Sequence, residues 1–135
     1  MEKMTVRMPV AVKARVTESL KAKIIGDLQK RIQQVDLDLE QLEFTAKRAL
    51  NEQENQDETL IPALKQQIDM ERSKRLAAKQ EVEAKLKRAE KLEYGAEIGH
   101  GQLERTVELE IGTDLDKLTG AEIVTEDGKI VAFRE

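Results

Sequence analysis

The sequence predicts an α+β protein, with a long antiparallel two-helix coiled-coil hairpin on a small, mainly antiparallel β unit formed by both chain ends. Three observations lead to this prediction. Residues 4–16 alternate strictly, residues 25–49 repeat apolar side chains at spacings of three and four, and most glycines come after residue 94. The composition agrees, because 37% of the 135 residues are charged and 2% are aromatic, which suits long solvated helices.

The N-terminal segment, residues 1–17, is predicted to be a β segment. Apolar side chains occupy every even position from Met4 to Val16, and a period of two is typical of a half-buried strand. Pro9 lacks the backbone N–H that a central strand needs. We therefore expect an edge position or a break there, giving two short strands or one strand interrupted at Pro9.

Residues 18–94 are predicted to be the helical hairpin. Thr17 suits the N-cap of a first helix over about residues 18–50. Its apolar seam holds the a/d pattern for four heptads, without proline. The seam consists of Ile25, Leu28, Ile32, Val35, Leu39, Leu42, Ala46 and Ala49.

The hairpin tip is predicted near residues 51–59, where no strongly apolar side chain occurs. Thr59 would cap a second helix from about Leu60 to Tyr94. Two long helices joined by a short turn must lie antiparallel. The second seam is poorer, because Glu71 and Arg75 interrupt it. Its apolar members are Ile61, Leu64, Ile68, Ala78, Val82, Leu86 and Ala89.

Residues 95–135 are predicted to be a second β segment packed with residues 1–17. Apolar and polar side chains alternate over residues 103–111, as in a strand. Farther on, Asp127-Gly128 lies between two β-rich runs, which is a strong signal for a two-residue hairpin turn. Glu126 and Lys129 would be its closing pair. A two-stranded hairpin is marginal in water, so the N-terminal strand is the expected third partner.

Several stretches resemble the YlqD family of uncharacterised bacterial proteins, in a form associated with cyanobacteria. They are VAVKARVT before the first helix, the charged hairpin itself, LEYGAEIGHGQLERTVELEIGTDL, and AEIVTEDGKIVAFRE at the end of the sequence. The resemblance covers essentially the whole chain. It implies a bacterial cytoplasmic protein built as a helical hairpin on a small β unit, and it carries over no activity and no functional residue.

Enzymatic chemistry is not indicated. The chain has no cysteine, and its single histidine, His100, has no second histidine to complete a metal or catalytic set. Ser19 and Ser73 have no base at a matching spacing. We therefore expect no catalytic residue, metal or cofactor, and a protein that is not an enzyme. The apolar runs are short, so we expect no membrane segment and a cytoplasmic location.

The favoured function is that of a non-enzymatic structural or interaction protein, of unknown biochemical role, that binds another macromolecule. Leu37 and Phe44 lie outside the first seam and are seven residues apart, so both point to one side of the helix. We expect this stripe to contact a protein partner or a second copy of the chain in a homodimer. Incidental exposure is the competing explanation.

Two alternatives start from charge. Lys85, Lys87, Arg88 and Lys91 crowd the second helix and suit a nucleic-acid- or ribosome-associated factor. Interleaved glutamates and the net charge of −4 favour an ordinary solvated face instead. The acidic tip suits a hairpin-tip regulator of RNA polymerase, but asparagine and glutamine separate its acids, so an ordinary turn is favoured.

Overall fold

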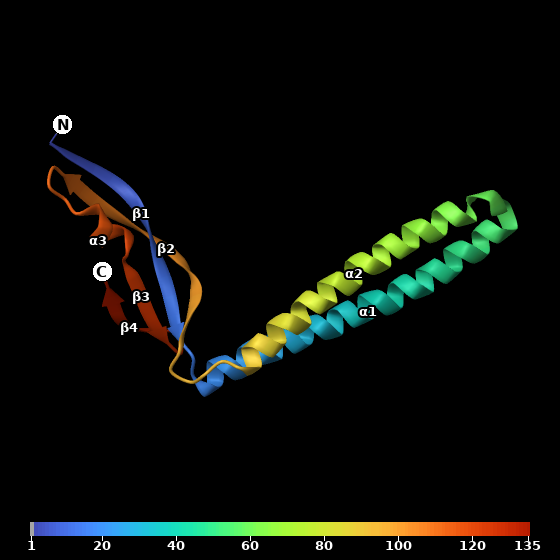
Figure 1. Ribbon diagram of the computed structural model, residues 1–135, viewed down its shortest axis with the longest axis horizontal. Coiled ribbons are helices and arrows are strands. Elements are labelled where there is room, and N and C mark those ends of the chain that lie inside the picture. Colours follow the sequence, from blue (N-terminus) through green and yellow to red (C-terminus); the bar gives the residue numbers. More distant parts are fainter. Residues whose placement is uncertain (1) are drawn as a thin grey trace. The chain divides into compact units, whose positions relative to one another are not determined.

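The computed structural model describes residues 2–135, and they form the predicted α+β fold (Figure 1). Two compact units are present: a β unit, made of the residues up to Ala22 and from Leu92 onward, and a hairpin unit, Lys23–Lys91. The elements in chain order are β1 (Lys3–Arg15), α1 (Glu18–Gln56), η1 (Glu58–Leu60), α2 (Ile61–Glu90), β2 (Glu97–Glu110), α3 (Leu115–Thr119), β3 (Glu122–Glu126) and β4 (Lys129–Arg134).

Both chain ends build the sheet, as predicted. Its strand order is β2-β1-β3-β4. β1 pairs antiparallel with β2 and parallel with β3, while β3 and β4 are antiparallel. The buried side chains are few and small, which follows from the scarcity of bulky apolar residues. They are Val10, Ala14, Val16, Ala121 and Val124.

The predicted break at Pro9 is wrong, because β1 is one continuous strand of 13 residues inside the sheet. The expected edge position is nevertheless present locally, because only one side of β1 is paired at Pro9. β3 pairs only with residues 11–14 of β1, so Pro9 has a strand partner, Glu104, on the β2 side alone. A residue without a backbone N–H is tolerated where one side of the strand is open.

β2 begins at Glu97, earlier than the predicted strand over residues 103–111. The pairing with β1 shifts between Ala11 and Lys13, so that His100 and Gly101 together face Val12. This is a β-bulge, and Gly101 adopts a φ of +122°, in the region that glycine tolerates best. The bulge interrupts the alternation of side chains, which explains why the sequence pattern missed the first half of the strand.

The turn between β3 and β4 has the predicted form. Glu126 pairs with Lys129, and Asp127 and Gly128 have φ values of 49° and 84°, as a two-residue turn of this kind requires. The Asp127 carboxylate accepts hydrogen bonds from Thr17 Oγ1 at 2.6 Å and Ser19 Oγ at 2.8 Å. These bonds hold the pKa of Asp127 below its usual range and join the turn to the start of α1.

The first seam is confirmed in the hairpin unit, where none of its eight residues is exposed. Leu28 and Ala46 are the most deeply buried, at 8% and 6% exposure. The tip is shorter than predicted, because α1 continues to Gln56. Glutamate and glutamine favour helix, so a polar sequence alone does not end one. Asp57, rather than Thr59, is the cap after the turn, and its carboxylate accepts from Thr59 N at 3.0 Å.

The second seam departs from its predicted course in the middle of α2, which also ends at Glu90 rather than Tyr94. Ala78 is exposed, and the neighbouring Lys79 is half-buried in its place. The half-buried position therefore lies four residues after Arg75 rather than three, and such a step shifts the buried stripe around the helix. Lys79 Nζ lies 2.6 Å from Asp36 Oδ1 of α1, and the ion pair raises the pKa of Lys79.

A second contact between the helices joins Arg72 and Glu43. Arg72 Nε lies 2.5 Å from Glu43 Oε1, and Nη2 lies 3.1 Å from Oε2, so the pair is bidentate. This hydrogen bonding lowers the pKa of Glu43. Glu43 follows Asp36 by seven residues and Arg72 precedes Lys79 by seven, so the two contacts specify the same antiparallel register.

We predict that Leu28→Ala lowers the free energy of unfolding by about 2–4 kcal/mol, because it leaves a cavity in the seam. Leu37→Ala on the same helix is the matched control and changes it by less than about 0.5 kcal/mol, since Leu37 is 58% exposed. Urea unfolding followed by far-ultraviolet circular dichroism measures both. Equal losses would contradict the buried seam.

We predict that the Glu43–Arg72 pair makes the hairpin sensitive to acid. The folded-state pKa of Glu43 is lowered, so its contribution to stability is present above the unfolded-state pKa and disappears as pH falls through the folded-state pKa. Glu43→Gln should therefore melt below the wild type at neutral pH, and the difference should close as the pH falls below the usual pKa range of glutamate. Glu52→Gln, at an exposed site on α1, should show no such gap.

Candidate interaction surfaces

Leu37 and Phe44 lie on the outer face of α1, as the sequence indicated. Their exposed fractions are 58% and 69%, whereas Val35 and Leu39 beside Leu37 are half-buried. Residues seven apart on a helix differ by only about 20° in direction, so the two side chains form one stripe. The helical period places this stripe on the side turned away from α2.

The four candidate basic residues, three in the last part of α2 and Lys91 at its C-cap, are all exposed, but they do not form one uncompensated set. Lys85 Nζ lies 3.6 Å from Glu81 Oε1 on the same helix. Within residues 2–135, no acidic partner lies within 4 Å of Lys87, Arg88 or Lys91. Lys91 lies four residues after Lys87 and three after Arg88, so these three cations share one face, and the ion pair with Glu81 distinguishes Lys85 from them.

The stripe on α1 and the basic face on α2 lie on opposite sides of the hairpin. Leu28, Ile68 and Ala89 belong to the buried seams, and each candidate group is on the side of its own helix away from that seam. The ion pairs also place Leu37 level with the middle of α2, whereas Lys87–Lys91 lie near its end. A partner that covers one group therefore leaves the other free.

One carboxylate of the acidic tip, that of Asp57, has a structural role. Asp57 accepts hydrogen bonds from both the hydroxyl and the backbone N–H of Thr59, which lower the pKa of Asp57. Gln53 Nε2 also donates to the Asp57 carbonyl at 2.8 Å. Glu52, Glu54 and Glu58 are exposed. The turn is thus ordered by its own side chains.

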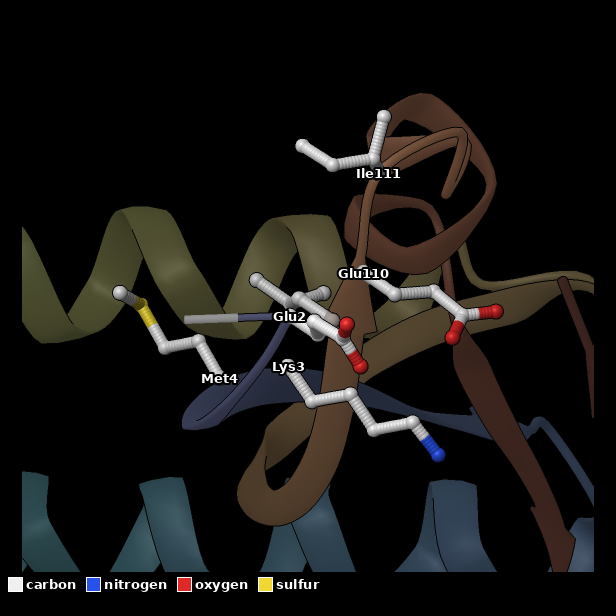
Figure 2. Close-up of a pocket in the computed structure, with 6 residues that line it drawn as sticks. Glu2, Lys3, Met4, Glu110 and Ile111 are labelled. Atoms are coloured by element: carbon white, nitrogen blue, oxygen red, sulfur yellow. The ribbon is translucent and has the colours of Figure 1, made fainter.

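The sequence reasoning missed one apolar surface, at the end of the β1–β2 ribbon. A shallow depression of about 230 Å³ is lined there by Met4, Leu109, Ile111 and the neighbouring Glu2, Lys3 and Glu110. Figure 2 shows the Met4 and Ile111 side chains projecting clear of the strands. Ile111 is 97% exposed. The alternation over residues 4–16 and 103–111 was the signal, because it places these side chains on one face of the ribbon.

Two kinds of site are absent from the part of the chain that the structure describes. Residues 2–135 contain no cluster of three or more histidine, aspartate or glutamate side chains arranged to hold a metal ion. No helix in the same range is both long enough and apolar enough to cross a membrane.

Comparison with known proteins gives a family match and a fold match. The family model described as YlqD protein matches residues 4–134. A crystal structure of a protein of unknown function from Synechococcus sp. WH 8102 matches with a TM-score of 0.80 and 24% sequence identity, over 98% of this chain and 95% of that chain. No curated protein matches. At this identity the structural match shows the fold alone.

Proposed function

The chain belongs to the YlqD family, as its sequence motifs indicated, and we propose that it is a non-enzymatic, cytoplasmic interaction protein that binds another protein through the outer face of α1. The observation that supports this proposal is the exposed stripe of Leu37 and Phe44. Phe44 is the one aromatic residue between residues 18 and 90, and it is 69% exposed. Aromatic side chains are enriched at protein interfaces.

A second copy of the chain is the first partner to test, because the stripe is self-complementary. If two α1 helices cross antiparallel between Glu40 and Gln41, Leu37 of each copy meets Phe44 of the partner subunit. The same register places Gln33 opposite Arg48 of the partner subunit, so no like charges oppose one another along the stripe. The contact would join two hairpins as a four-helix coiled coil with two-fold symmetry.

We predict that Leu37→Lys with Phe44→Lys abolishes the dimer and leaves the monomer folded, because neither side chain belongs to the buried seam. Four lysines from two copies would then face one another across the two-fold axis and repel. Size exclusion with light scattering at several concentrations measures the mass, and circular dichroism checks the helix content.

The matched control is Met70→Lys with Leu76→Lys on α2, which replaces two apolar side chains with exposed fractions of 57% and 44%. This control should remain dimeric. A monomeric wild type would contradict self-association. In that case, the proposal would be supported if the wild type captured a different protein and the double variant of α1 did not. No capture by either would contradict it.

Nucleic-acid binding through α2 is the second candidate function, and a specific observation favours it: three neighbouring cations have no acidic partner within the described residues. We predict that Lys87→Gln, Arg88→Gln and Lys91→Gln together weaken binding to a labelled single-stranded RNA and flatten its salt dependence, since fewer phosphate contacts are made. Fluorescence anisotropy at several salt concentrations measures this. Lys85→Gln is the control, and a wild type without a salt-dependent signal would contradict this function.

The hairpin-tip role at RNA polymerase stays a weaker alternative, because Asp57 already serves as a cap.

A further inference from the structure

The β unit contains a cavity on one face of the sheet. Arg134 of β4 and Glu97 of β2 make a bidentate ion pair between the two outermost strands, with N–O distances of 2.5 and 2.6 Å. The cavity has a volume of about 300 Å³. The residues of its lining that matter here are Val10, Leu103, Arg105, Ala121, Ile123 and Phe133.

The walls of this cavity are apolar and its rim is open. Val10 and Ala121 are 5% exposed at its floor, whereas Leu103 and Phe133 are 56% and 74% exposed. Ligand sites are typically concave, mostly apolar, and supplied with a few polar groups that orient the ligand. A ligand in the cavity would cover the exposed apolar surface of Leu103 and Phe133 and remove it from water.

Among the charged residues that line the cavity, Arg105 is the one with a buried nitrogen that has no hydrogen-bond partner within the described residues. Its Nη1 lies 3.2 Å from Oε1 of Glu135, the last residue of the sequence, and its Nη2 donates to the Leu118 carbonyl at 3.3 Å. Its Nε is buried and has no hydrogen-bond partner within residues 2–135. A buried N–H without an acceptor is unfavourable, so the guanidinium has unused capacity to bind an acceptor group.

We propose that this cavity binds a single-chain carboxylic acid, with its alkyl chain between Leu103 and Phe133 and its carboxylate on Arg105 in place of Glu135. A carboxylate already contacts the guanidinium in the structure, and its two oxygens can accept from neighbouring N–H groups of arginine. Glu104 and Glu122 also line the cavity, and they disfavour a more highly charged head group such as a phosphate.

The volume limits the length of the chain. A space of about 300 Å³ holds on the order of ten water-sized groups of about 30 Å³ each, which corresponds to roughly eight to ten carbons. The inference does not depend on the proposed role of α1, because every residue of this site lies in the β unit. The two can therefore fail separately.

Isothermal titration calorimetry with decanoate as the probe tests this site. The wild type should bind decanoate at least about ten-fold more tightly than decanol, since the alcohol lacks the charge-assisted contact. Arg105→Gln should weaken decanoate binding by about ten-fold or more while changing decanol binding little. Glu135→Gln should tighten decanoate binding, because it removes the competing carboxylate. Lys129→Gln, outside the cavity lining, should bind as the wild type does.

If Arg105→Gln does not fold, Glu135→Gln still tests the site. The Glu135 side chain is 65% exposed, so its replacement removes no buried group. Methyl resonances locate the probe: Leu103 and Ile123 should shift on addition of decanoate, and Met4 and Ile111 should not. Absence of binding, equal binding of decanoate and decanol, or shifts confined to Met4 and Ile111 would each overturn the proposal.

Discussion

The fold depends first on the pairing of β1 with strands on both of its sides. β2 and β3 come from the other end of the chain, so β1 closes the β unit across the whole intervening sequence. At its end, Val16 N donates to Ala96 O at 2.7 Å and Gly95 N donates to Val16 O at 2.8 Å. Lys21 Nζ continues this contact at Leu92 O, 3.0 Å away, and lies 5.5 Å from the centre of the Tyr94 ring. The chain therefore leaves and re-enters the β unit at adjacent points, and the residues between must form an element that returns on itself.

Within the hairpin unit, apolar packing and ion pairs have different roles. The seam of α1 has no exposed member, whereas the seam of α2 is interrupted in its middle and has its buried residues on either side, at Ile68 and Ala89. Solvated ion pairs contribute little free energy each. The contacts of Lys79 with Asp36 and of Arg72 with Glu43 act instead on register, because a shifted pairing of the helices would leave these charges beside apolar side chains.

Both proposed functions rest on apolar surface that stays exposed, on the outer face of α1 and beside the small side chains of the sheet. A two-helix hairpin buries one stripe per helix, so Leu37 and Phe44 stay outside. A four-stranded sheet with Ala14 and Val124 as its most buried members leaves Leu103 and Phe133 beside a cavity that its own side chains do not fill. Binding a protein at the first surface and a carboxylic acid at the second would each complete a unit that the chain leaves partly open.

The fold class, the seam of α1 and the turn at Asp127-Gly128 could be predicted from the sequence, because periodicity and turn chemistry act over a few residues. The sequence also indicated the stripe of Leu37 and Phe44, whose exposure follows from the same period. Three features became visible only in the folded protein: Pro9 lies in a continuous strand, Lys79 replaces Ala78 beside α1, and Arg105 contacts Glu135 at a cavity. Each of these depends on a partner distant in the sequence: a strand that stops short of Pro9, an acid on the facing helix, and a glutamate thirty residues farther along the chain. Local patterns contain no information about such partners, because the chain must first fold before those side chains share an environment.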